Sequence, residues 1–382
     1  MSEAKKTSDT EPPFASNVER LTLKQWLWVV FFMAVIGWGV PFLWPTCERF
    51  CPPSDYRLSY ELSNDYWMFK QWCDEAVKRY PCVLIGDSVI WGQYVKKEET
   101  LSHALNRAAG RELFANLGVD GLHPAAIYGL IKYHGTSLRN RQVIINFNPL
   151  WYTSARLDLQ GNEEARFNHP GLVPQFFSKP ACYRAEFTER IRNVMSRQVS
   201  FLTWLNHVNM VYFDNVGFFQ WTMDHPYRLS FKGRAEGPHF KDDKPHGAPK
   251  TWEEQGIGKQ DFEWVDLRGS VQWRFFRRAL QLLTGRGNQV FVLVGPFNPY
   301  LLSKTSQEKH KQLRAEVEGY LKEHHVEHWV VPDLPSAEFA DASHPLSLGY
   351  ERMANELAGA YELKKRFRPA PGADGETINR QP

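Results

Sequence analysis

The chain has 382 residues, of which 43% are hydrophobic and 23% are charged, and these proportions are ordinary for a folded protein. The length suits one elaborated α/β domain with appendages better than a single minimal domain. The formal net charge is only +3, and no long block of lysine and arginine occurs. We therefore expect no nucleic-acid partner.

The amino-terminal part predicts a cytoplasmic disordered tail over residues 1–24 and a transmembrane anchor over residues 25–45. No charged residue occurs from Trp26 to Trp44, and this length suits a helix that spans a bilayer. A cleaved signal peptide is the alternative, but the apolar run is longer than a usual signal core and no small-x-small cleavage site follows. Pro41 and Pro45 are expected to kink or end the helix. Basic residues are more frequent before the anchor than after it, which favours a cytoplasmic amino terminus and a periplasmic or extracellular body.

Short apolar and β-branched runs alternate with helical patterns in the rest of the chain. Strands are expected at residues 83–85, 113–117, 142–147, 289–294 and 327–331, and helices at 65–79, 98–110, 125–138, 270–283, 305–323 and from Ser347 onward. Such alternation predicts an α/β fold with a doubly wound parallel sheet and helices on both faces. Residues 46–80 then form a linker and leading helix, residues 81–368 the main domain, and residues 369–382 a disordered tail.

An insertion of the main domain is expected at about residues 150–268, because the gap between the third and fourth strands far exceeds what a crossover needs. It contains a helical pattern at 186–199, a loop rich in Gly, Pro, His and charges at 232–250, and many aromatic residues. These aromatic residues either pack a small subdomain, which we favour, or line a cleft for a sugar ring or an acyl chain. They are Phe213, Phe218, Phe219, Trp221, Tyr227, Trp252, Phe262 and Trp264.

Five cysteines occur, and none belongs to a paired Cys-x-x-Cys pattern. In an exported body, Cys47 or Cys51 could pair with Cys73 or Cys182. Cys82 begins the first expected strand, so we expect it to be buried as a small apolar residue.

A candidate catalytic group follows the first strand, where Gly86-Asp87-Ser88 places a serine at the strand end. Ligands of open parallel sheets bind at the carboxyl ends of the strands. A serine hydroxyl needs a base within hydrogen-bond reach and a third group that orients this base. After the fifth strand, Asp341 and His344 lie three residues apart, which suits an orienting carboxylate and a general base. Asp87 is interpreted as structural, bonding to nearby backbone.

Donors for an oxyanion are expected at the ends of the first three strands. They are the backbone N–H of Ser88, the backbone N–H of Gly121, and the side-chain amide of Asn148. The third strand also offers Asn146, but Asn148 is favoured because it lies just beyond the strand end.

These four segments resemble the blocks of the SGNH, or GDSL, hydrolase superfamily, which supply Ser, Gly, Asn and His. Gly86-Asp87-Ser88 matches the first block, the stretch ending in Gly121 the second, Asn148 the third, and Asp341-x-x-His344 the fourth. The third block departs from the family pattern, since Asn146 and Pro149 replace its Gly and Asp. The resemblance covers about residues 80–150 and 288–360 and implies the flavodoxin-like fold of these hydrolases.

The resemblance also implies a function, namely a membrane-anchored serine esterase that acts through an acyl-enzyme at Ser88 without a metal or other cofactor. The substrate would be an ester-linked acyl group of an envelope glycan or lipid. The anchor and the insertion resemble those of tethered members in cell-envelope acylation complexes. Two alternatives remain open, an O-acyltransferase for an envelope polysaccharide and a non-catalytic scaffold in an envelope complex.

Overall fold

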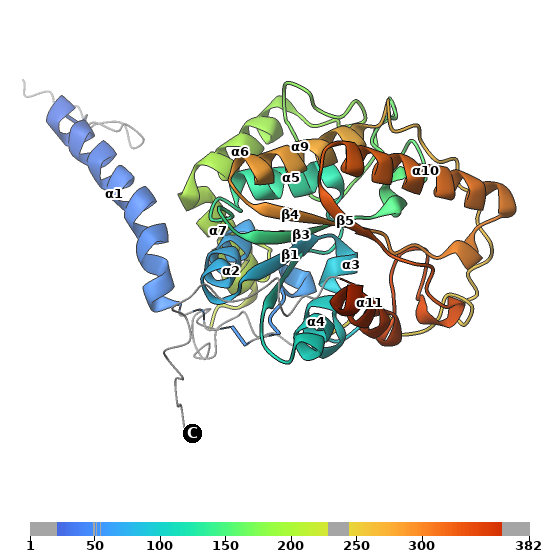
Figure 1. Ribbon diagram of the computed structural model, residues 1–382. Coiled ribbons are helices and arrows are strands. Elements are labelled where there is room, and N and C mark those ends of the chain that lie inside the picture. Colours follow the sequence, from blue (N-terminus) through green and yellow to red (C-terminus); the bar gives the residue numbers. More distant parts are fainter. Residues whose placement is uncertain (1–20, 49, 51, 54, 228–243, 361–382) are drawn as a thin grey trace, which may run out of the picture. The chain divides into compact units, whose positions relative to one another are not determined.

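The computed structural model describes residues 21–48, 50, 52–53, 55–227 and 244–360, and the expected terminal tails and most of the loop at 232–250 lie outside these ranges (Figure 1). Contacts divide the chain into two units, Met1–Cys47 and Glu48–Pro382. The first unit contains α1 (Leu23–Cys47), a helix that is long and apolar enough to cross a membrane. Neither Pro41 nor Pro45 ends this helix, because a proline removes a single backbone hydrogen bond and the flanking turns can still form.

The second unit is built on a parallel sheet of five strands. The strands are β1 (Cys82–Gly86), β2 (Phe114–Gly118), β3 (Gln142–Phe147), β4 (Gln289–Val294) and β5 (Glu327–Val330). Their order is β2-β1-β3-β4-β5, and every neighbouring pair is parallel. This is the flavodoxin-like strand order, so the predicted α/β fold is confirmed. The order reverses beside β1, which places the end of β1 at a topological switch point, where ligands of such sheets bind.

Helices cover both faces of this sheet, with α5 beside α9 on one face and α4 beside α11 on the other (Figure 1). The helices of the sheet domain are α2 (Tyr66–Arg79), α3 (Ser88–Trp91), α4 (Leu101–Ala109), α5 (Pro124–Tyr133), α9 (Val271–Gly285), α10 (Lys304–Glu323) and α11 (Ser347–Ala360). Short 3₁₀ helices lie at Tyr60–Leu62, Lys97–Glu99, Pro149–Tyr152, Pro299–Leu301 and Ser336–Glu338.

Local sequence signals explain most helix limits. The carboxylate of Asp65 accepts the Met68 N–H and so caps α2, while Ser270 caps α9 through the Trp273 N–H. The expected helix at 98–110 is broken, because Thr100 is extended and separates a 3₁₀ turn from α4. The expected helix at 125–138 ends early, at Tyr133, since Gly135 follows closely and offers little support for another turn.

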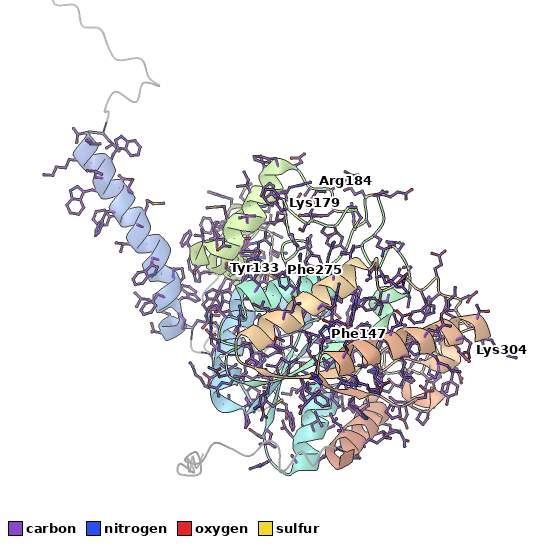
Figure 2. All side chains as sticks on the ribbon, turned by 45° about the horizontal axis from the view of Figure 1, so that its top comes forward. Tyr133, Phe147, Lys179, Arg184, Phe275 and Lys304 are labelled. Carbon is purple, nitrogen blue, oxygen red and sulfur yellow. The ribbon has the colours of Figure 1, made fainter. Side chains whose placement is uncertain are left out.

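The insertion contains α6 (Phe187–Gln198), α7 (Ser200–Tyr212) and α8 (Phe218–Asp224). Asp158 ties it to the sheet domain, since its carboxylate accepts the backbone N–H groups of Val271 and Gln272 at the start of α9, at 2.9 and 3.1 Å. Phe275 of α9 is fully buried in a cluster with Val173 and Tyr183 of the insertion. Figure 2 labels Phe275 on α9. The insertion therefore shares a core with the sheet domain.

Some aromatic residues of the insertion are buried, as in a packed subdomain, and others are exposed. Trp221, Trp252 and Trp264 are buried, as a packed subdomain requires. Phe218 and Phe219, in contrast, are 57% and 83% exposed. Packing alone therefore does not account for the whole aromatic set.

The disulfides that the sequence allows with Cys73 or Cys182 do not form in the described part of the structure, where both thiols are free and buried. The Cys73 thiol lies 3.4 Å from the Ser137 hydroxyl, and the Cys182 thiol donates to the Leu159 carbonyl. Both sulfur atoms are therefore buried, each beside a neighbouring oxygen atom. Cys47 is free and exposed, and Cys51 lies outside the described residues.

Cys82 is fully buried at the start of β1, as predicted.

Candidate active site

Ser88 is the first residue of α3, directly after the carboxyl end of β1. Asp87 is extended and caps α3 by accepting the Val89 N–H at 3.0 Å. A side chain at Gly86 would approach the Asn146 amide oxygen to 1.9 Å, so only glycine lets β1 and β3 lie this close at the turn. Ser88 itself is 5% exposed. The tight strand-to-helix turn thus presents the hydroxyl at the switch point of the sheet.

His344 and Asp341 meet Ser88 in space although His344 follows it by 256 residues in the sequence. The His344 Nε2 lies 2.7 Å from the Ser88 Oγ, and its Nδ1 lies 2.8 Å from both carboxylate oxygens of Asp341. The backbone N–H groups of Ser343 and His344 also donate to Asp341, at 2.9 and 3.0 Å. The structure therefore brings together a hydroxyl, a base and an orienting carboxylate in the order that an activated serine requires.

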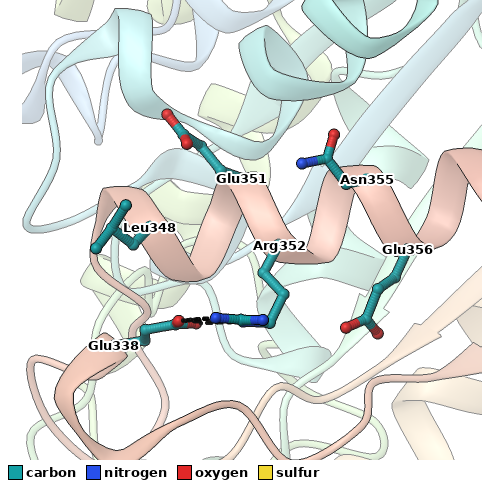
Figure 3. Close-up of a pocket in the computed structure, with 6 residues that line it drawn as sticks. All are labelled: Glu338, Leu348, Glu351, Arg352, Asn355 and Glu356. Carbon is teal, nitrogen blue, oxygen red and sulfur yellow. Dashed lines mark hydrogen bonds and ion pairs between the residues drawn. The ribbon is translucent and has the colours of Figure 1, made fainter.

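The loop that carries Asp341 and His344 is closed on itself and braced by α11. Within it, the Ala340 N–H donates to the His344 carbonyl at 2.9 Å, and the Leu346 N–H donates to the Glu338 carbonyl at 2.7 Å. The Glu338 carboxylate accepts both Nε and Nη2 of Arg352 from α11 (Figure 3). Bidentate pairs of this kind fix orientation as well as adding energy. The loop is thus held in one geometry.

Electrostatics in this loop favour a charged Asp341 and a basic His344. Burial alone would raise the pKa of Asp341, but His344 and the two backbone donors lower it to about 2. Burial likewise lowers the pKa of His344, and Asp341 outweighs this and raises the pKa above its ordinary value. The imidazole is therefore a stronger base than an isolated histidine, which suits proton transfer from Ser88.

Asp87 organises the end of β3 beneath Ser88. Its carboxylate accepts the Asn148 amide at 2.7 Å, the Trp151 indole N–H at 2.7 Å, and the Asn146 amide at 3.1 Å. The Asn148 amide nitrogen carries two hydrogens, and besides Asp87 it donates to the Ser343 hydroxyl over a long 3.5 Å. Both asparagines thus contact the same carboxylate, and Asp87 has a structural role that includes side chains as well as the Val89 backbone.

Gly121 lies in the loop after β2 and has φ = +69°, a conformation that favours glycine. A side chain there would approach the Asn168 amide nitrogen to 2.2 Å, so a segment of the insertion lies against this loop. The His169 Nε2 bonds to the Asp120 carbonyl at 2.7 Å and fixes the loop further. Burial raises the pKa of Asp120, and the charge of His344 opposes this. The loop therefore belongs to the same electrostatic environment as the Ser88–His344 pair.

Two neighbours of the site were not predicted. The Tyr94 hydroxyl donates to Asp341 at 3.2 Å, and its ring meets the His344 ring edge-on at 5.6 Å. Nothing in the local sequence marks Tyr94, because its partners come from the other end of the chain. Trp151 lies three residues after Asn148, and an indole so close to a strand-end motif was a signal that could have been used.

No family model and no curated protein matches the chain. Among solved structures, it is similar to a protein assigned to the lipolytic G-D-S-L family from Desulfitobacterium hafniense, with 10% identity, a TM-score of 0.34, and coverage of 73% of this chain and 97% of that one. It is also similar to a family two carbohydrate esterase from Clostridium thermocellum in complex with cellohexaose, with 10% identity, a TM-score of 0.32, and coverage of 76% and 66%. The fold assignment itself rests on the strand order described above.

The site holds a serine hydroxyl, a histidine and a carboxylate joined in series by hydrogen bonds. Among the described residues, no three histidine, cysteine, aspartate or glutamate side chains are grouped so that they could hold a metal ion. Ser88, His344 and Asp341 together can form and break a covalent bond to an acyl carbon.

Proposed function

We propose that the protein is a serine acyl hydrolase that acts through an acyl-enzyme at Ser88. The observation that carries this proposal is the continuous series of hydrogen bonds from Asp341 through His344 to Ser88. A scaffold has no need of a buried imidazole between a carboxylate and a hydroxyl. The altered third segment does not break this series, so it gives a non-catalytic role little support.

In the proposed reaction, the Ser88 Oγ attacks the carbonyl carbon of an ester while the His344 Nε2 takes the hydroxyl proton. Asp341 stabilises the imidazolium that forms and keeps the Nδ1 hydrogen in place. When the tetrahedral intermediate collapses, the ester C–O bond breaks and His344 gives the proton to the leaving alcohol. A water molecule then attacks the acyl-enzyme while His344 takes its proton. His344 returns this proton to the Ser88 Oγ as the acyl C–O bond breaks, which releases the acid and restores Ser88.

Three donors are proposed to stabilise the oxyanion of each intermediate. They are the N–H of Ser88 at the start of α3, the N–H of Gly121, and the second amide hydrogen of Asn148, which would exchange its long contact with the Ser343 hydroxyl for the oxyanion. Asp87 positions Asn148 by accepting its first hydrogen. Removal of one such donor typically lowers turnover about 10²- to 10³-fold.

The proposed substrate is an ester-linked acyl group on a glycan or lipid of the cell envelope. Support comes from α1, whose length and apolar composition suit a membrane anchor. With a cytoplasmic amino terminus, the body would lie on the periplasmic or extracellular side, where envelope esters and an acylation complex would be its partners.

Hydrolysis of p-nitrophenyl acetate by the detergent-solubilised full chain tests the nucleophile. We expect Ser88→Ala to abolish enzyme-dependent hydrolysis. Ser102→Ala, which removes another buried hydroxyl in α4, is the matched control and should keep the wild-type rate. Equal rates for wild type and Ser88→Ala would refute the proposal and favour a scaffold.

The fate of the acyl group separates hydrolysis from O-acyl transfer, because both share the same first half-reaction. The purified chain is incubated with an acetyl donor and candidate envelope glycans, and the products are analysed by mass spectrometry. A hydrolase releases free acetate at the same rate with or without glycan. An acylated glycan that depends on Ser88 would instead identify a transferase.

A further inference from the structure

A large cavity lies outside the candidate active site, between the helices of the insertion and the ends of α2 and α5. Its volume is about 710 Å³, and neither Ser88, Asp341 nor His344 lines it. Apolar side chains such as Leu205 and Phe213 share the wall with polar ones, among them Arg192, Arg197 and His134. Ligand sites in proteins typically occupy about 300–1,000 Å³ and combine apolar walls with a few polar groups. The size and lining therefore fit a ligand site.

One polar group of the wall is the guanidinium of Arg197 in α6. Its Nη1 donates to the carbonyls of Val173 and Leu172, at 3.0 and 3.5 Å, and its plane lies 4.7 Å over the Tyr133 ring. A guanidinium has five N–H donors, so the Nε and Nη2 hydrogens remain for another acceptor. No carboxylate occurs among the residues that line the cavity. The wall thus carries two arginines, Arg197 and Arg192, and no carboxylate to balance their charge.

A second polar group of the wall is the imidazole of His134, which is 4% exposed and stacks on the Tyr66 ring at 5.1 Å. Among the described residues, no partner bonds its Nε2. Burial, followed by the charge of Arg197, lowers the pKa of His134 to about 4, so the ring is neutral near pH 7. Buried polar atoms without partners are rare and indicate an unseen partner such as a ligand or a water molecule.

The cavity opens at an apolar rim on α7 and α8. Leu205 is 46% exposed and Phe218 is 57% exposed, and both line the cavity. Beyond the rim, Phe219 and Met223 are 83% and 76% exposed. Contiguous exposed apolar side chains of this kind mark a contact with another apolar body.

We propose that this cavity binds one acyl chain of an anionic phospholipid, with the lipid phosphate at Arg197 and a polar head-group atom at the His134 Nε2. A purely apolar ligand would give no acceptor to the Nε and Nη2 hydrogens of Arg197 and no partner to the His134 Nε2. A small anion would leave the apolar part of the wall uncovered. The choice of a membrane lipid as the ligand rests on the proposed membrane anchoring by α1. The presence of the cavity and of its arginines is independent of that proposal.

Native mass spectrometry of the full chain released from maltoside micelles tests this proposal. The probe is palmitoyl-lysophosphatidylglycerol, which carries one acyl chain and one phosphate. Monopalmitoylglycerol supplies the chain without the charge, and inorganic phosphate supplies the charge without the chain. We expect one lysophosphatidylglycerol per chain, held at least tenfold more tightly than monopalmitoylglycerol, and no binding of phosphate alone. Equal affinity for the charged and uncharged lipid would overturn the proposal, as would binding of phosphate alone.

Two arginine variants locate the site. Arg197→Gln should remove the tenfold preference for the anionic lipid. Arg286→Gln is the matched control, because Arg286 also donates to backbone carbonyls, those of Ile131 and Gly135, and does not line the cavity. Thermal unfolding of both variants checks that each is folded. Loss of the preference in both variants, or in neither, would contradict the assignment.

Two further measurements separate this cavity from the candidate active site. Ser88→Ala should bind the lysophosphatidylglycerol as the wild type does, so the result is independent of any hydrolase activity. Nitrogen-15 spectra of labelled histidines should show the His134 ring signals moving on addition of the lipid. Unchanged His134 signals in a lipid-saturated sample would refute the proposed placement.

Discussion

Replacement of Asp341 by asparagine is the substitution that separates a catalytic triad from a fortuitous hydrogen-bond series. The new amide keeps one oxygen, which can still accept the backbone N–H groups of Ser343 and His344. The other oxygen becomes an NH₂ group that donates to His344 Nδ1. The hydrogen of the imidazole then moves to Nε2, and His344 can no longer accept the Ser88 proton.

The expected loss follows from the tautomer. A triad with the wrong histidine tautomer turns over about 10⁴-fold more slowly, which corresponds to about 5.4 kcal/mol at 1.36 kcal/mol for each factor of ten. The pH profile should change as well. His344 must be neutral to act, so kcat/KM of the wild type rises with pH through a pKa that Asp341 holds above its ordinary value. Without that negative charge the effect of burial dominates, and the midpoint moves to lower pH.

The assay is p-nitrophenyl acetate hydrolysis by the full chain between pH 4 and pH 10. Asp333→Asn is the matched control, since its carboxylate is 55% exposed and pairs with Arg314, an interaction worth about 0–1 kcal/mol. It should leave both rate and pH profile unchanged. An Asp341→Asn rate within tenfold of the wild type, with the same midpoint, would refute the assigned role of Asp341.

Three further predictions concern the surroundings of the site and the fold. Asp87→Ala should lower kcat about 10²- to 10³-fold with little change in KM, because Asn148 loses the partner that orients it; unchanged kcat would exclude this positioning role. Gly118→Ala should destabilise the fold by about 1–3 kcal/mol in urea unfolding, since a Cβ there meets the Trp91 backbone nitrogen at 2.4 Å. Gly319→Ala is the matched control in α10, where a Cβ meets nothing within 4 Å. This second variant should stabilise the fold by about 0.5–1 kcal/mol. His207 lies between Asp65 and Glu48, and although burial lowers its pKa, these carboxylates raise the pKa to about 9. The stabilising contribution of His207 is full below pH 6.5 and is lost as the pH rises to about 9. The fall in Tm over this pH range should therefore be smaller in His207→Gln than in the wild type.

The sheet could be predicted from sequence because β1 to β4 are short, mainly apolar and almost wholly buried, whereas β5 is only partly buried and rests on its place after a helical pattern. The expected limits at 142–147 and 289–294 are those of β3 and β4. Helix limits were less certain where a cap depends on a distant residue. Asp158, for example, fixes the start of α9 from 113 residues away, and no local pattern shows this.

The geometry of the candidate site was only partly predictable. Ser88, Asp341 and His344 carry their chemistry in the sequence, and parallel strands bring strand ends together. The contacts of Tyr94 with Asp341 and of Trp151 with Asp87 depend on loops whose paths the sequence pattern does not specify. The cavity at Arg197 was missed for the same reason, because it forms only where α6, α7 and α8 fold onto the ends of α2 and α5.

Covalent labelling of Ser88 by a fluorophosphonate tests the central claim most directly, because the reagent reacts with a serine only when a base activates it. The full chain is labelled at neutral pH, digested, and analysed by mass spectrometry. We predict one modified peptide, with the adduct on Ser88, and loss of labelling in His344→Ala. An unlabelled Ser88, or labelling that persists without His344, would contradict the account.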